Sequence, residues 1–161
     1  MAQSDSEIRF IEGKEKEDFL EMLNNQFGVK SIPGIILMRG KERIFLFSGS
    51  FGKGKIKSLE RMAFVERAGV YLGKIDDFGV RLSIEGSQIL KSEIKKNIVD
   101  LDKAEMETWM MGHELLKKTG LAGFVIMRYK RDMLGTGKAS EDKITNFIPK
   151  SRRLKDKNVE S

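Results

Sequence analysis

The last third of the chain constrains the fold most, because it contains three short apolar runs separated by turn-forming residues. The runs cover about residues 124–130, 133–139 and 143–148, and such runs, bounded by Gly, Asp and Ser, predict successive β-strands. Lys and Arg are interleaved with them: residues 117–161 hold 12 cationic against 5 acidic side chains, whereas residues 1–116 hold 18 against 19. Charge concentrated in one segment of an otherwise neutral protein indicates a polyanionic partner.

The first third of the chain has the pattern of a small α/β lobe. Apolar residues recur at helical spacing over residues 14–27, and Gly28 ends this predicted helix. Two β-rich runs follow, over residues 35–38 and 44–47, and residues 39–42 between them have the composition of a hairpin turn. A further helix is predicted over residues 57–64.

From about residue 65 the apolar period changes from helical to alternating, which predicts strands near residues 70–73 and 80–82 and another at 97–101. Ser83 can cap a short helix that runs to Leu90. Asp102 with Glu105 has the spacing of a capping box, and Gly112 stops the helix that follows. Many short strands with two short helices predict an α+β fold in which a small mixed barrel follows the α/β lobe.

Composition excludes several classes of protein. The chain of 161 residues contains no cysteine, so disulfides, thiolate metal sites and cysteine nucleophiles are excluded. No apolar run approaches the roughly 20 residues that span a bilayer, and the first ten residues lack the regions of a signal peptide. We therefore expect a cytoplasmic protein with no membrane partner.

The order of elements from residue 65 to residue 154 resembles a PUA domain, a compact RNA-binding pseudobarrel. Three segments carry the resemblance: an aliphatic strand GFVIMRYKRD, a Leu-Gly-x-Gly segment at residues 134–137, and a Pro-Lys-x-Arg-Arg segment at residues 149–153. They look like the C-terminal PUA region of archaeal Sun-type RNA 5-methylcytosine methyltransferases. The first lobe is similar to the pre-PUA domain of Nip-type ribosome-biogenesis factors. This implies a pre-PUA-like lobe over residues 1–64, a PUA domain over 65–154 and a mobile tail over 155–161.

The resemblance implies that RNA lies in a groove between the helix at residues 83–90 and the last strand with its basic extension. Alternation in strand 124–130 would put Arg128 and Lys130 on one face, and Lys138 follows a predicted turn at Gly135–Gly137. Cations neutralise phosphates, whereas amide and aromatic side chains can read or stack bases, and Gln88, Asn146 and Tyr129 are the candidates for this role. The predicted RNA-binding residues are Arg81, Gln88, Lys91, Arg128, Lys130, Lys138, Asn146, Lys150, Arg152 and Arg153.

The sequence departs from the methyltransferases where their chemistry resides. It contains no glycine-rich cofactor fingerprint at a strand end and no cysteine to attack cytosine. We therefore expect no enzyme activity, no catalytic residue, no cofactor and no metal.

The strongest rival motif is GSFGKGK at residues 49–55, which matches the start of a phosphate-binding P-loop. Ile56 stands where a Mg²⁺-binding Ser or Thr belongs, which favours a basic turn over a nucleotide-hydrolysing loop. The single histidine, His113, follows a helix end and is expected to cap it. Asp76 and Asp77 are expected to lie in a turn.

The sequence thus predicts non-catalytic binding of structured RNA, either rRNA or tRNA, through a basic PUA groove, in ribosome biogenesis or RNA modification. The expected partner beyond RNA is a preribosomal particle or an RNA-modifying enzyme. Two alternatives stay open: a standalone recognition subunit that delivers RNA to a separate modifying enzyme, and, with less support, a P-loop nucleotide-binding protein.

Overall fold

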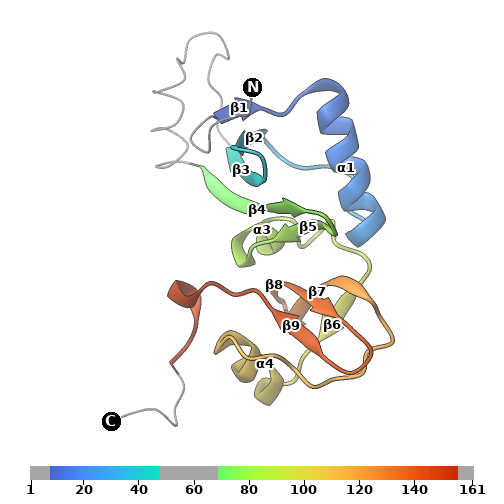
Figure 1. Cartoon of the computed structure of the whole chain (residues 1–161), viewed down its shortest axis with the longest axis vertical. Coiled ribbons are helices and arrows are strands. Elements are labelled where there is room, and N and C mark those ends of the chain that lie inside the picture. Colours follow the sequence, from blue (N-terminus) through green and yellow to red (C-terminus); the bar gives the residue numbers. More distant parts are fainter. Residues whose placement is uncertain (1–7, 48–68, 156–161) are drawn as a thin grey trace.

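The computed structural model describes residues 8–47 and 69–155, and the first of its two sheets is built from both ranges. Its strands are β1 (Ile8–Phe10), β2 (Ile35–Arg39), β3 (Arg43–Phe47), β4 (Val70–Asp76) and β5 (Gly79–Leu82). They pair in chain order, and every pair is antiparallel. This sheet forms the upper half of the molecule in Figure 1.

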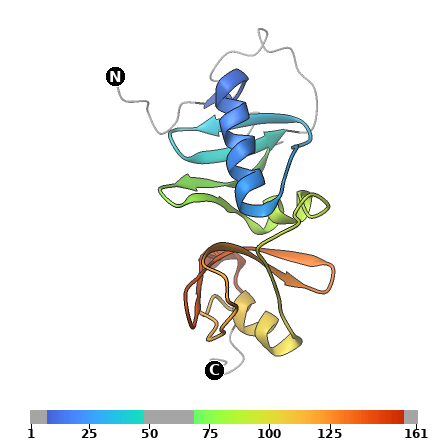
Figure 2. The same cartoon turned by 90° about the vertical axis from the view of Figure 1, so that its right-hand side faces the viewer.

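Helix α1 (Gly13–Phe27) covers one face of the first sheet, in front of which it runs in Figure 2. Its Phe19, Leu23 and Phe27 are buried against strand residues, as the helical spacing predicts. Gly28 adopts φ 77° and its N–H donates to the carbonyl of Asn24, which ends the helix. The other face of the sheet is therefore free of α1.

The second sheet forms the lower half and contains β6 (Ile98–Asp100), β7 (Gly123–Tyr129), β8 (Asp132–Ala139) and β9 (Ile144–Asn146). Strand β6 is parallel to β7, and the other pairs are antiparallel. Helix α4 (Lys103–Met110) begins with the predicted capping box of Asp102 and Glu105. Its Trp109 is fully buried, and the indole Nε1 donates to the carbonyl of Leu134 at 3.0 Å.

Helix α3 (Ile84–Ile89) joins the two sheets. Its Gly86 lies so close to β4 that an added Cβ would be 2.0 Å from the carbonyl oxygen of Leu72. On the other side, the buried Ser87 hydroxyl accepts from the N–H of Gly135 at 3.0 Å. The buried Thr136 hydroxyl accepts from the N–H of Leu82 in β5 at 2.9 Å. One apolar core, which includes residues of α1, β4, β5, β7 and β8, runs through both sheets.

The α+β class is confirmed, as are the helices at residues 14–27, 83–90 and 102–112 and most strands. The described strands form two open sheets. Strand β1 was not predicted, because three residues carry too little periodicity. The last strand is shorter than predicted: only Ile144–Asn146 pair with β8. The predicted helix over 57–64 lies outside the described residues.

The predicted turn at Gly135–Gly137 is wrong, because these residues lie inside β8. Gly135 and Gly137 are needed because neighbouring elements pack closely against β8, and not because the chain turns there. A Cβ on Gly137 would be 2.6 Å from Ile144 and 2.7 Å from Trp109. Gly135 has φ 81° and faces the start of α3. The Leu-Gly-x-Gly segment that carries the resemblance is therefore a place where β8 packs against α3 and α4.

The expected division of the chain at residue 64 does not coincide with a break in backbone pairing, since β4 pairs with β3 along their length. The boundary between the two lobes stays a prediction. In the part of the chain that the structure describes, no helix is long and apolar enough to cross a membrane.

Candidate nucleic-acid interface

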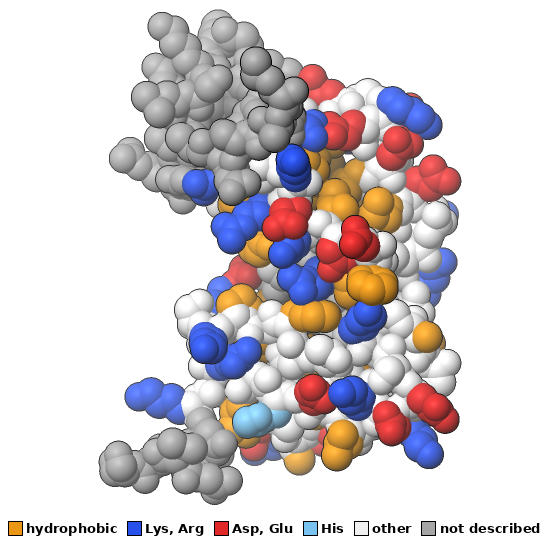
Figure 3. Space-filling model, viewed as in Figure 1, with side chains coloured by type: hydrophobic (Ala, Val, Ile, Leu, Met, Phe, Trp, Pro, Cys, Tyr) orange, Lys and Arg blue, Asp and Glu red, His pale blue; other side chains and the backbone are white. Residues whose placement is uncertain are grey.

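A groove lies where the two halves of the molecule meet, between β4, β5 and the start of α3 on one side and the C-terminal segment on the other. We call it the central groove. Figure 3 shows a hollow at the middle of one edge of the molecule, with Lys and Arg side chains on both of its lips. The central groove is lined by Tyr71, Lys74, Arg81, Ser83, Ile84, Glu85, Phe147, Pro149 and Arg152.

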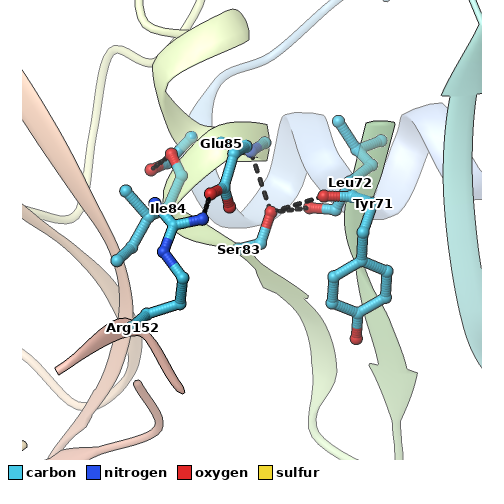
Figure 4. Close-up of polar contacts among 8 residues, drawn as sticks. Tyr71, Leu72, Ser83, Ile84, Glu85 and Arg152 are labelled. Atoms are coloured by element: carbon cyan, nitrogen blue, oxygen red, sulfur yellow. Dashed lines mark hydrogen bonds and ion pairs between the residues drawn. The ribbon is translucent and has the colours of Figure 1, made fainter. Parts of the chain in front are cut away.

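Ser83 fixes the wall of the central groove. Its hydroxyl caps α3 by accepting from the N–H of Gly86 at 2.9 Å, and it donates to the carbonyl of Tyr71 at 2.6 Å (Figure 4). One side chain thus holds the first turn of the helix against strand β4. The predicted N-cap is confirmed, and it keeps the groove's wall in one position.

Arg152 spans the central groove. It belongs to the short 3₁₀ helix η1 (Lys150–Arg152), and its guanidinium pairs with the carboxylate of Glu85 in the first turn of α3 (Figure 4). Lys150 is exposed. The Nε of Arg153 donates to the carbonyl of Ile148 at 2.9 Å, and its guanidinium lies against Gly112. The contacts of Arg152 and Arg153 therefore hold the segment of residues 149–153 against the rest of the protein.

A second group of cations lies on aromatic rings. The guanidinium of Arg81 is 4.3 Å from the centroid of the Phe147 ring, and the Nζ of Lys138 is 3.3 Å from that of Phe78. Phe124 contacts both rings edge-on, with centroid separations of 6.1 Å to Phe147 and 6.5 Å to Phe78. This chain of contacts connects Arg81 in the groove to Lys138 on β8. Phe78 is 69% exposed, so its ring presents a face to solvent.

Tyr71 lies beside these cations and packs on Phe45, with the ring centroids 5.5 Å apart. Burial of the hydroxyl raises the pKa of Tyr71, and this outweighs the opposite effect of the nearby Arg43 and Arg81 charges. Because the raised pKa lies above the ordinary value near 10, the phenol stays protonated at neutral pH. It can therefore donate a hydrogen bond into the groove while its ring, 37% exposed, offers a stacking face.

Two predicted base readers are occupied by the protein itself. The amide oxygen of Gln88 accepts from the N–H of Met133 at 2.8 Å, and its nitrogen is 3.3 Å from the Asp132 carboxylate. Asn146 donates to the carbonyls of Trp109 and His113 and accepts from the N–H of Ile148. Both side chains hold neighbouring segments together.

Arg128 is also held by the protein. It forms two hydrogen bonds with the carboxylate of Asp100, at 2.6 and 2.9 Å, across the parallel pair of β6 and β7. The hydrogen bonds with Arg128 lower the pKa of Asp100, and the same pair raises the pKa of Arg128. Arg128 and Lys130 do not share a strand face as predicted. Strand β7 ends at Tyr129, and Lys130 opens a tight turn with φ 54°.

Lys130 and Lys91 are both exposed, Lys130 in that turn and Lys91 just after α3. The Nζ of Lys130 is 5.3 Å from the Tyr129 ring centroid. Neither residue lines the central groove. Of the predicted residues, the structure brings Arg81 and Arg152 into the groove.

Sequence reasoning missed the aromatic residues Tyr71, Phe78 and Phe147. Tyr71 lies in β4 and Phe147 just after β9, in apolar runs where an aromatic residue is normally core, and Phe78 lies in the turn after β4. Tyr71 carried a usable signal, because strict alternation with the buried Leu72 predicts that it faces outward. The contacts of Phe147 and Phe78 with cations can be recognised only in the folded structure, because they join strands that are distant in the sequence.

Among the described residues, no cluster of three or more His, Asp and Glu could hold a metal ion. Asp76 accepts from the N–H of Phe78, as expected for a turn. The backbone N–H of His113 donates to the carbonyl of Thr108 at 3.3 Å. The P-loop-like segment at residues 49–55 lies outside the described residues.

Comparison with known proteins identifies the second half of the chain. Residues 96–154 match the family model of the methyltransferase RsmF PUA domain. Ribosomal RNA small subunit methyltransferase F of Aeromonas salmonicida (strain A449) is 29% identical over 143 residues, which are 87% of this chain and 28% of that protein. The protein of the same name from Vibrio vulnificus (strain YJ016) is 30% identical over 93 residues, 58% of this chain and 20% of that protein.

These matches confirm the resemblance to a PUA region of RNA methyltransferases. The Aeromonas alignment extends well beyond residues 96–154, so it includes much of the first sheet. Both relatives are bacterial, whereas the sequence resemblance points to archaeal enzymes. The chain spans 28% and 20% of the length of these two relatives.

Proposed function

Because residues 96–154 match the family model of the methyltransferase RsmF PUA domain, we propose that the chain binds structured ribosomal RNA in the central groove, in the context of rRNA modification and in the cytoplasm. It does so without catalysing a reaction itself. The observation that carries this proposal is the composition of the groove, in which the rings of Tyr71 and Phe147 lie beside Lys74, Arg81 and Arg152. Cations bind phosphates, and aromatic faces stack unpaired bases.

The predicted site residues and the newly found aromatic residues divide by role under this proposal. Arg81, Lys138, Lys150 and Arg152 would contact RNA phosphates, and Tyr71 with Phe147 would stack bases. Gln88 and Asn146 would support the walls, because their polar atoms are already used by the protein. Lys91, Lys130 and Arg128 would contact only RNA that extends beyond the groove.

The test replaces Lys150, Arg152 and Arg153 together with Ala. Binding of an rRNA fragment should weaken about 100-fold at low salt, and the slope of log K against log salt should flatten by up to about three counterions. The fold should survive, because these side chains are exposed. Fluorescence anisotropy at several salt concentrations measures both quantities.

The matched control replaces Lys14, Lys16 and Lys30 with Ala. Lys14 and Lys16 belong to α1 and Lys30 follows it, so the change removes equal charge away from the groove. Equal losses in both variants would mean that binding follows net charge alone, and the groove would then be abandoned. If only the control variant lost RNA affinity, the RNA site would lie at α1 and not in the central groove.

A second candidate function is delivery of RNA to a separate modifying enzyme. It is favoured by the names of the relatives, which are methyltransferases far longer than this chain. Copurification separates the two settings. A preribosomal particle would favour a role in assembly, whereas a methyltransferase would favour delivery.

A further inference from the structure

The face of the first sheet that is turned away from α1 carries a row of four cations. Strand register places Arg39 of β2 opposite Arg43 of β3, Arg43 opposite Lys74 of β4, and Lys74 opposite Arg81 of β5. Register partners in neighbouring strands point to the same side of a sheet. We call these four residues the cation row. At about 4.8 Å between strands, it crosses about 14 Å of the sheet.

Burial identifies the face on which the row lies. Met38, next to Arg39 in β2, and Ile44, next to Arg43 in β3, belong to the core beneath α1. Because adjacent strand residues point to opposite sides, the cation row lies on the other face. Figure 3 shows Lys and Arg side chains gathered there, at the upper lip of the hollow.

A β-bulge brings Tyr71 to the same face. Arg43 pairs with Lys74 and Phe45 with Tyr71, so β4 uses one more residue than β3 over this stretch. Without that extra residue, Tyr71 would point into the core and Leu72 outward. The next register row, Phe10, Leu37, Phe45 and Tyr71, therefore runs beside the cations. The two rows meet the central groove at Tyr71 and Arg81.

Such a row costs stability in the absence of an anion, since like charges directly opposite one another repel. Lys74 is paired with Glu42 at 3.3 Å. No ion pair joins Arg43 or Arg81 to a carboxylate in the described ranges. Asp76, which shares the face two residues from Lys74, accepts from a backbone N–H of its own turn. Within the described ranges, the positive charges of Arg43 and Arg81 are therefore not compensated by an ion pair.

We propose that the cation row is a second RNA-binding segment, which holds the phosphate backbone of an RNA strand as it leaves the central groove. This inference rests on the proposed function, because the row continues the groove. The row supplies point charges in a line and no base-reading group, so it binds without sequence preference. In this arrangement, RNA bases stack on the protein as far as Tyr71. Beyond Tyr71, the protein contacts only the RNA phosphate backbone.

The experiment compares two RNAs: a hairpin alone, and the same hairpin with a single-stranded extension. The wild-type protein should bind the extended RNA more tightly. The double variant Arg43→Gln/Lys74→Gln should lose about tenfold in affinity for the extended RNA at low salt, with the salt slope flattened by about one to two counterions. Because Lys74 also lines the central groove, the loss of affinity for the hairpin alone should be smaller than the loss for the extended RNA, and equal losses would overturn the row.

The control variant is Lys14→Gln/Lys30→Gln, which removes two exposed cations near α1. The melting temperature at low salt is a second measurement. If Arg43 and Lys74 served only to stabilise the fold, their replacement would lower it. The double variant should melt at a temperature equal to or above that of the wild type, because repulsion within the row is relieved.

The row is overturned if the double variant binds the extended RNA as the wild type does, or loses no more than the control. A loss confined to the Lys150/Arg152/Arg153 variant would overturn the row and leave the groove intact. If the wild-type protein binds neither RNA, the proposed function and the row both fail.

Discussion

Glu85 and Arg152 form the contact that most directly decides access to the central groove. Their side chains are 38% and 50% exposed, so the ion pair contributes at most about 1 kcal/mol to stability. RNA phosphate can replace the carboxylate as the partner of Arg152, because a guanidinium binds phosphate oxygens as it binds carboxylate oxygens. If RNA binds in the central groove as proposed, Glu85 competes with it for the guanidinium of Arg152.

We expect the substitution Glu85→Gln to strengthen RNA binding up to about fivefold at low salt, because up to about 1 kcal/mol is no longer spent on breaking the ion pair. Anisotropy titration measures the change. The control is Glu21→Gln on α1, which alters net charge equally. An equal gain in both variants would show that Arg152 is not held back by Glu85.

At the level of secondary structure, strand β6 is a short edge strand of the second sheet. It has three residues and pairs only with β7, in parallel. The bidentate contact between Asp100 and Arg128 fastens its last residue to its register partner. Because Arg128 holds the pKa of Asp100 below its usual range, the contact stabilises the fold while the carboxylate is charged.

The substitution Asp100→Asn should lower the free energy of unfolding at pH 7 by up to about 1 kcal/mol. The native pKa of Asp100 is lowered, so this contribution is present above the unfolded-state value near 3.9 and disappears as pH falls through the native value. Urea melts at neutral and acidic pH measure the difference. Asp142→Asn in an exposed turn is the control; an equal effect in both variants, or one that persists in strong acid, would contradict this role.

Most elements could be predicted from the sequence because their signals are local. The capping box at Asp102, the stop at Gly28 and the cap at Ser83 each depend on residues within a few positions. The central groove could be predicted only as a location, because its members come from β4, β5, α3 and the C-terminal segment. The bulge that places Tyr71 on the same face as Lys74 depends on pairing with β3, which no local pattern records.

At the scale of the whole molecule, the first sheet and the PUA domain act as one surface. A single apolar core joins them, and α3 is bonded to both sheets. The central groove and the stacked pair Arg81 and Phe147 lie where the halves meet, and the cation row runs from Arg81 across the first sheet to Arg39. An RNA bound at one part is therefore positioned for the next.

Ultraviolet crosslinking of the full chain to an rRNA hairpin, followed by mass spectrometry of the peptides, tests this account most directly. Aromatic side chains stacked on bases are close enough to crosslink. RNA bound in the central groove should crosslink to Tyr71 and Phe147. These crosslinks should be reduced in the variant in which Lys150, Arg152 and Arg153 are replaced. Crosslinks confined to the α1 face around Lys14 and Lys30, or none at the groove while RNA is bound, would contradict it.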